Sequence, residues 1–185
     1  MEKEYSNSEK KFMTVEDNEL KEMNEDKNSE VETHNCTNVL HNQFLRNISS
    51  YFLPPHAPHY RWIFNKINKL VHELNGRKYN FDIDGLIEPV QLTKYSNNGF
   101  YSDHIDLGNT YPESDRKLSF TIQLSDSENY DGGNVILKTS HIKNQISKGL
   151  GSITFWPSFM LHNVEPITKG NRWSLCGWIS GKQFK

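Results

Sequence analysis

The chain has 185 residues, of which 35% are hydrophobic and 24% charged, and its formal net charge is −2. This length suits one domain with its own core, and two cysteines are too few for a disulfide framework. No stretch approaches the roughly 20 apolar residues of a membrane span, and the charged start of the chain does not resemble a signal peptide. We therefore expect an intracellular, cytoplasmic protein without a membrane partner.

Charge is unevenly distributed along the chain. Residues 1–35 hold eleven Asp or Glu and five Lys, a net charge of −6, so residues 36–185 carry about +4. The acidic excess and the low apolar content predict a disordered tail over 1–35. The folded domain is then expected over 36–185. It shows no stripe of Lys and Arg, so a nucleic-acid partner is not expected.

Two helices are predicted ahead of the strands. Apolar residues recur at helical spacing from Leu40 to Tyr51 and predict a helix that ends near Phe52. A proline-rich connector follows over 53–59. A second apolar stripe from Ile63 to Leu74 predicts another helix, with Asn75-Gly76 as its stop.

The remainder of the sequence has the period-2 alternation of short strands. Candidate strands lie near 90–95, 118–124, 135–137, 152–156 and 172–179, with Asn- and Gly-rich turns between them. Short strands without intervening helices favour a sandwich or jelly roll over a parallel sheet. The expected fold class is α+β, mainly β, with the N-terminal helices supporting the β core.

Three residues have the chemistry of a metal site. His104 and Asp106 are two residues apart, so in an extended segment they point to the same face. His162 supplies a second imidazole from a distant part of the chain. Two histidines and one carboxylate form the facial triad that holds Fe(II) and leaves open positions for chemistry. The sequence therefore predicts an iron site at these three residues.

A candidate anion-binding pair follows the last of these histidines. Arg172 lies ten residues after His162, and Ser174 is on the same face of the predicted final strand. A guanidinium group binds a carboxylate through a fixed pair of donors, and a hydroxyl group can add another. We expect Arg172 and Ser174 to bind an anionic cosubstrate that also reaches the metal.

These residues together resemble the 2-oxoglutarate- and Fe(II)-dependent dioxygenases, and in particular the prolyl 4-hydroxylase branch with its prolyl/lysyl hydroxylase-type members. Beyond the triad and Arg172, the resemblance rests on Tyr95, nine residues before His104. It also rests on local motifs at 116–119, 130–133, 156–158 and 162–167. Members of the collagen-modifying type often have Lys where this chain has Arg172, which leaves the subtype open.

The resemblance implies a double-stranded β-helix, also called a jelly roll, with iron at its mouth. It implies an enzyme that hydroxylates a prolyl residue in a protein or peptide with Fe(II), 2-oxoglutarate and O2, and with ascorbate as a supporting reductant. Succinate and CO2 are the coproducts. In this pattern Arg172 and Tyr95 hold the far carboxylate of 2-oxoglutarate.

Two other functions remain open from the sequence. One is a dioxygenase that hydroxylates a free amino acid or another small molecule. The other is a jelly-roll binding module without activity, although such a module would usually have lost a ligand or the anchor. The polar segment 107–117, directly after two predicted ligands, is either a lid over a substrate or a passive connection. The sequence leaves the oligomeric state open.

Overall fold

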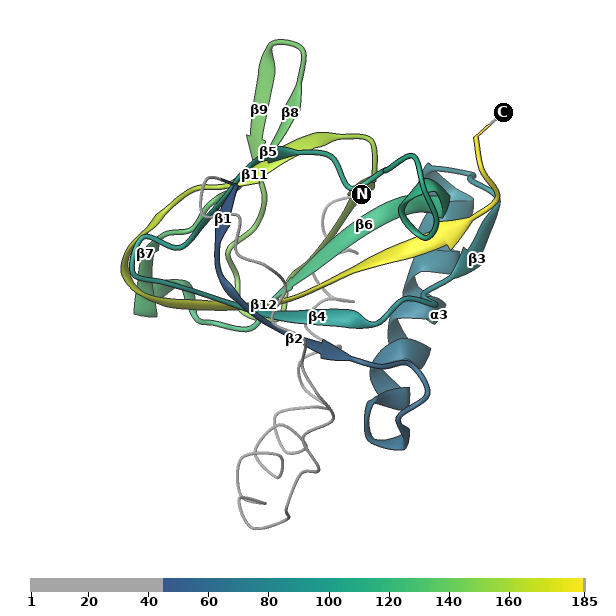
Figure 1. The fold of residues 1–185 in the computed structure, drawn as a ribbon, viewed down its shortest axis with the longest axis horizontal. Coiled ribbons are helices and arrows are strands. Elements are labelled where there is room, and N and C mark those ends of the chain that lie inside the picture. Colours follow the sequence, from purple (N-terminus) through teal and green to yellow (C-terminus); the bar gives the residue numbers. More distant parts are fainter. Residues whose placement is uncertain (1–44, 185) are drawn as a thin grey trace.

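The structure is a computed structural model that describes residues 45–184, and it is built mainly from antiparallel strands (Figure 1). One α-helix and three short 3-10 helices accompany the strands in this part of the chain. In chain order the elements are β1 (Arg46–Asn47), β2 (Ser49–Leu53), η1 (Pro58–Tyr60), α3 (Arg61–Lys78), β3 (Ile83–Gly85), β4 (Val90–Ser96), β5 (Phe100–His104), η2 (Glu113–Asp115), β6 (Arg116–Gln123), η3 (Ser127–Asn129), β7 (Tyr130–Gly132), β8 (Val135–Thr139), β9 (Ile142–Gln145), β10 (Ile153–Pro157), β11 (Leu161–Val164) and β12 (Ile167–Gly181).

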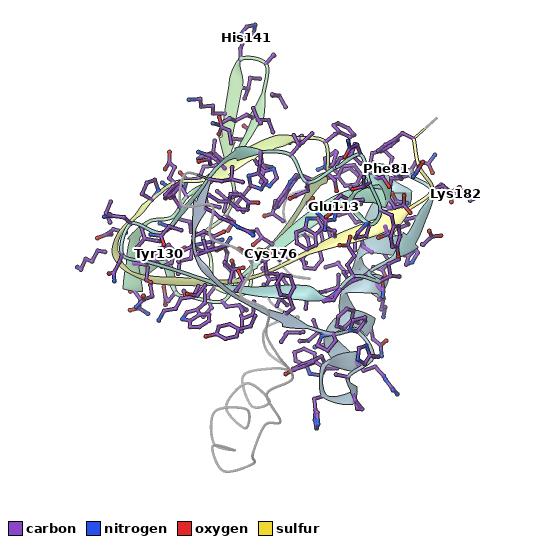
Figure 2. All side chains as sticks on the ribbon, in the orientation of Figure 1. Phe81, Glu113, Tyr130, His141, Cys176 and Lys182 are labelled. Atoms are coloured by element: carbon purple, nitrogen blue, oxygen red, sulfur yellow. The ribbon has the colours of Figure 1, made fainter. Side chains whose placement is uncertain are left out.

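The strands form two sheets that face one another. The smaller sheet has the order β1-β5-β11-β8-β9, and the larger has the order β10-β6-β12-β4-β2. Short strands β3 and β7 pair with the ends of the long strand β12. Figure 1 shows β8 and β9 projecting from the body as a hairpin, and Figure 2 shows His141 at its tip. Two antiparallel sheets with short turns confirm the predicted jelly-roll architecture.

The main hydrophobic core lies between α3 and the larger sheet. The helix buries Phe64, Ile67 and Val71, which recur on one face at intervals of three and four residues. They pack in one cluster with apolar side chains from the sheet. Each fully buried side chain of this kind contributes about 1.5–3 kcal/mol. The sheet residues of this cluster are Val90, Leu118, Phe120, Ile122, Leu175 and Ile179.

Helix α3 confirms the second predicted helix but continues past the predicted stop. Its last residue is Lys78, so Asn75 and Gly76 lie within the last turn. The backbone carbonyl of Asn75 accepts from the N–H groups of Tyr79 and Asn80. Asn80 has a φ of +53°, the left-handed conformation that closes many helices. The residue in the left-handed conformation that follows the helix is therefore Asn80, and the predicted stop at Asn75-Gly76 lies inside the last turn.

The prediction of a first helix is wrong for residues 45–52, the part of it that the structure describes. Instead of a helix ending near Phe52, β1 and β2 occupy 46–47 and 49–53. Strand β2 lies at the edge of the larger sheet, where Ser49 to Leu53 pair with Lys94 to Val90 of β4. The aromatic and serine side chains of this segment are compatible with an edge strand. Pairing with β4 therefore overrides the local helical spacing.

Three other sequence expectations lie outside residues 45–184. They are the acidic tail predicted for 1–35, the start of the domain at residue 36, and the beginning of the first predicted helix, from Leu40 to Phe44. Among residues 45–184, no helix has the length and apolar character that spanning a bilayer would require.

The junction between α3 and the sheets yields a first prediction. The buried Asn75 side chain donates to the carbonyl of Phe81 and accepts from its N–H, both at 2.9 Å. Asn75→Ala leaves both backbone groups unpaired, so we expect the free energy of unfolding to fall by about 2 kcal/mol. Urea denaturation of Asn75→Ala and of the exposed-site control Asn65→Ala measures this loss. An equal effect of both substitutions would contradict the role of Asn75.

Candidate functional site

The pairing of β5 with β11 brings together the three predicted metal ligands. His104, the last residue of β5, lies directly opposite His162 of β11. Asp106 follows two residues after β5 ends, and its backbone N–H donates to the carbonyl of Ser158 at 2.9 Å. One potential ligand atom from each of His104, Asp106 and His162 lies within 4.8 Å of the others. The structure therefore brings together the three residues that the sequence predicts as metal ligands.

Backbone carbonyls orient both imidazole rings. Nδ1 of His104 lies 2.7 Å from the carbonyl oxygen of Ser102, and Nδ1 of His162 lies 2.9 Å from that of Met160. A carbonyl only accepts, so each Nδ1 donates, and Nε2 is the ring nitrogen of each histidine that is left to bind a metal. Both Nε2 atoms face the Asp106 carboxylate, at 3.7 Å for His104 and 3.3 Å for His162. Such outer hydrogen bonds fix the orientation of metal-binding histidines.

Aromatic side chains surround the two rings. Tyr101 stacks on His104 with ring centroids 3.7 Å apart, and Trp156 meets His162 edge-on at 5.1 Å. Burial lowers the pKa of His104, and the neighbouring His162 lowers it further. His104 is thus held as the neutral imidazole, the form that binds a metal.

The donor set fits an octahedral iron ion. Bonds of about 2.1 Å from nitrogen and oxygen ligands to a metal place adjacent ligand atoms about 3 Å apart. The separations of 3.3 and 3.7 Å between the Asp106 oxygens and the two Nε2 atoms are close to this value. Asp106 and the two histidines can therefore hold Fe(II) after a small adjustment.

A pocket extends from this cluster toward the larger sheet. Its wall includes His104, Asp106 and His162 together with the inward face of β4. That face carries Gln91, Thr93 and Tyr95, as alternation along the strand predicts. From β12 the wall includes Arg172, Cys176 and Trp178. Figure 2 shows Cys176 within the body of the protein, in the part of the fold where this pocket lies.

Within residues 45–184, Arg172 is the only Arg or Lys on this wall, and it is buried, with 1% of its surface exposed. Its Nε donates to the side-chain oxygen of Gln123 at 3.0 Å. Neither Nη1 nor Nη2 makes a hydrogen bond of ordinary geometry to residues 45–184, although the phenols of Tyr95 and Tyr130 lie close enough to interact with the guanidinium. A buried guanidinium with two free donors is a costly arrangement unless an anion completes it. The pocket is therefore suited to a carboxylate at this end.

Tyr95 lies opposite Arg172 in the register of β4 and β12. The guanidinium carbon is 5.1 Å from the centre of the Tyr95 ring. Burial raises the pKa of Tyr95, and the neighbouring Arg172 only partly offsets this effect. The phenol therefore stays protonated and can donate to an anion beside Arg172.

Ser174, the third residue expected to hold the cosubstrate, lies on β12 between Arg172 and Cys176. Ser174 is fully buried, but it is not part of the pocket wall between Arg172 and Cys176. Its hydroxyl lies 3.7 Å from the Cys176 sulfur, and its register partners are Thr93 and Gln123. Of the three residues expected to hold the cosubstrate, only Tyr95 and Arg172 line the pocket.

Sequence reasoning missed three residues of this site. Gln123 falls within the predicted strand 118–124, but the strand pattern cannot reveal that it orients Arg172. Tyr101 and Trp156 pack on the histidines, but an aromatic residue in a strand usually indicates core packing. Recognising their role requires the pairing of β5 with β11, which the spacing in the sequence does not specify.

Comparison with known proteins identifies the family. The sequence profile of the 2OG-Fe(II) oxygenase superfamily matches residues 90–180. A PKHD-type hydroxylase of Prochlorococcus marinus strain AS9601 is 38% identical over 101 residues, which cover 54% of this chain and 45% of that protein. Another, from strain MIT 9303, is 41% identical over 80 residues, or 43% of this chain and 35% of that protein. The match thus spans less than half the length of these relatives.

Solved structures share the fold at low sequence identity. A Pseudomonas putida prolyl-4-hydroxylase superposes with a TM-score of 0.62 at 18% identity, covering 76% of each chain. A Trichoplax adhaerens prolyl hydroxylase in complex with a peptide fragment of the hypoxia inducible factor gives 0.62 at 17%, covering 74% of this chain and 64% of that one. The viral collagen prolyl hydroxylase of Paramecium bursaria Chlorella virus-1, in its 2OG complex, gives 0.57 at 21%, with 75% and 81% coverage.

The profile, the relatives and the His-Asp-His cluster agree with one another. Through residues 90–180, the chain belongs to the 2OG-Fe(II) oxygenase superfamily, whose members use Fe(II) and 2-oxoglutarate.

Proposed function

We propose that this protein is a 2-oxoglutarate-dependent hydroxylase that acts on a prolyl residue in a protein or peptide. His104, Asp106 and His162 hold Fe(II), while Arg172 and Tyr95 hold the far carboxylate of 2-oxoglutarate. The observation that carries the proposal is the pocket itself. It has three metal-binding side chains at one end and a buried, half-satisfied guanidinium at the other.

The protein residues divide the work of binding and orientation. Arg172 donates to one carboxylate of 2-oxoglutarate from Nη1 and Nη2. Gln123 accepts from Nε and so fixes the orientation of the guanidinium. Tyr95 donates a further hydrogen bond. This anchoring aims the other end of the dicarboxylate at the His-Asp-His cluster. Bound Fe(II) would supply the oxygen chemistry that converts 2-oxoglutarate and O2 to succinate and CO2 and hydroxylates the substrate.

The pocket wall also protects the site. Trp156 and Tyr101 cover the histidine rings, and Val135 and Val164 add apolar surface. An apolar wall excludes water and limits side reactions of an oxidising centre. A binding module without activity would have no need for this combination of complete ligands, anchor and wall.

A peptide substrate is supported by the segment that follows Asp106. Its base is fixed, because the N–H of Leu107 donates to the carbonyl of Ser158 at 3.0 Å and that of Gly108 to Glu113 at 3.1 Å. Tyr111 lies between Gly108 and Glu113, and its side chain is 73% exposed. An exposed aromatic ring on a fixed loop can pack on a pyrrolidine ring. The Trichoplax relative, which is described in complex with a peptide, adds support by analogy.

The metal assignment predicts a common defect in three variants. His104→Ala, Asp106→Ala and His162→Ala each remove one of three ligands, so each should abolish 2-oxoglutarate turnover and leave the domain folded. Succinate formation with Fe(II) and O2 measures turnover, and circular dichroism checks folding. Substantial succinate formation by His162→Ala would contradict the assignment.

The cosubstrate assignment predicts an order of effects. Arg172→Ala removes a buried charged donor pair, which costs about 2–5 kcal/mol and raises the 2-oxoglutarate requirement roughly 30-fold or more. Ser174→Ala removes a hydroxyl outside the pocket wall and should change it by roughly fivefold at most. Initial rates against 2-oxoglutarate concentration measure both. A larger effect of Ser174→Ala would mean that the anchor has been misidentified.

The substrate assignment predicts that two activities can be separated. Tyr111→Ala should weaken hydroxylation of proline-containing peptides about tenfold through loss of an aromatic contact. It should leave uncoupled 2-oxoglutarate turnover unchanged, because Tyr111 is not among the residues that line the pocket. Mass spectrometry measures the added oxygen, and Tyr51→Ala, on the distant edge strand β2, is the control. Hydroxylation of free proline but of no peptide would favour the small-molecule alternative.

A further inference from the structure

A buried ion pair lies beside the metal ligands and has no part in the function proposed above. The guanidinium of Arg116, at the start of β6, binds Glu88 through two parallel hydrogen bonds. Nε donates to Oε1 at 2.9 Å and Nη2 to Oε2 at 2.6 Å. The side chains are only 11% and 10% exposed. Glu88 precedes the segment 90–180 that matches the family.

The same guanidinium reaches two parts of the site. Its Nη1 donates to the backbone carbonyl of Asp106 at 3.3 Å. Its Cζ lies 3.9 Å from the centre of the Trp178 ring, and Trp178 lines the pocket. The Glu88 carboxylate occupies the edge of the planar guanidinium formed by Nε and Nη2, so the group has little freedom to turn.

Asp106 depends on such contacts because it lies beyond the end of β5. Its N–H is held by the carbonyl of Ser158, and its own carbonyl is held by Arg116. These two bonds fix the backbone on both sides of the carboxylate-bearing carbon. The peptide after Asp106 is also held by the N–H of Leu107, which donates to the carbonyl of Ser158 at 3.0 Å. Release of Arg116 therefore removes one of the two hydrogen bonds on this peptide, and the carboxylate gains freedom to rotate away from the two histidines.

We propose that Glu88 is a positioning residue, which through Arg116 holds Asp106 in place for metal binding. This inference rests on the proposed function, because it assumes that Asp106 is a metal ligand. Outer-shell partners of this kind typically change metal affinity by about 10–100-fold. Affinity for 2-oxoglutarate should be less affected, since its anchors Arg172 and Tyr95 lie on β12 and β4.

The first test uses Glu88→Gln, which keeps the size of the side chain and removes its charge. Binding of Mn²⁺ to the metal-free protein, followed by electron paramagnetic resonance, should weaken about tenfold or more. Asn75→Ala is the matched control, because it lowers stability without touching the site. It should bind Mn²⁺ like the unaltered protein. Unchanged Mn²⁺ affinity in Glu88→Gln would overturn the inference.

A charge swap separates positioning from simple stabilisation. The double variant Glu88→Arg with Arg116→Glu can re-form the ion pair, but a carboxylate at 116 cannot donate to the Asp106 carbonyl. The melting temperature should therefore recover relative to Arg116→Glu alone, while Mn²⁺ affinity stays about tenfold low. Recovery of both would show that the pair is only structural. If the swap does not fold, the comparison of Glu88→Gln with Asn75→Ala decides.

The outcomes also separate this inference from the proposed function. If the unaltered protein binds no Mn²⁺, the metal assignment itself fails. If the unaltered protein binds Mn²⁺ and Glu88→Gln binds it equally well, only the role of Glu88 fails.

Discussion

The register between β5 and β11 is the constraint on which the site depends. It places His104 and His162 opposite one another, and the short step from His104 to Asp106 adds the carboxylate. A shift of one residue would turn one histidine to the other face of the sheet. The backbone carbonyls of Ser102 and Met160 then fix the rings, so main-chain geometry alone sets which nitrogen is free. The ligand set is thus a product of strand pairing more than of side-chain packing.

The two sheets divide the site between them. The smaller sheet carries the histidines, and the larger one carries Tyr95 and Arg172 on neighbouring strands. Two apolar clusters lie on the two faces of the larger sheet. One is between α3 and the larger sheet, and the other includes Tyr95, Tyr130 and Ile167 between the sheets. Gly133, with a φ of +60°, allows close packing here, since an added Cβ would lie 3.1 Å from Arg172 Cδ.

Sequence reasoning predicted the features that local patterns encode. Alternation identified the strands near 90–95, 118–124 and 172–179, and residue spacing predicted the cluster of His104, Asp106 and His162. It failed at β2, where the apolar spacing between Leu40 and Tyr51 suited a helix and only pairing with β4 makes a strand. It also could not place Ser174 outside the pocket wall, because alternation gives the face of a strand but not the depth of a cavity. Glu88 gave no signal, since its partner Arg116 lies 28 residues away.

The central position of β12 has a consequence for how the protein is made. This strand pairs with β3, β4, β6 and β7, all of which are synthesised before it. The larger sheet cannot close until residues 167–181 have left the ribosome. Until then β4 and β6 each present an unpaired edge, a state prone to pairing with other chains. Arg172 and Trp178 arrive on this same strand, so the pocket is completed in the step that closes the sheet. No partial fold that lacks residues 167–181 therefore contains both the His-Asp-His cluster and Arg172.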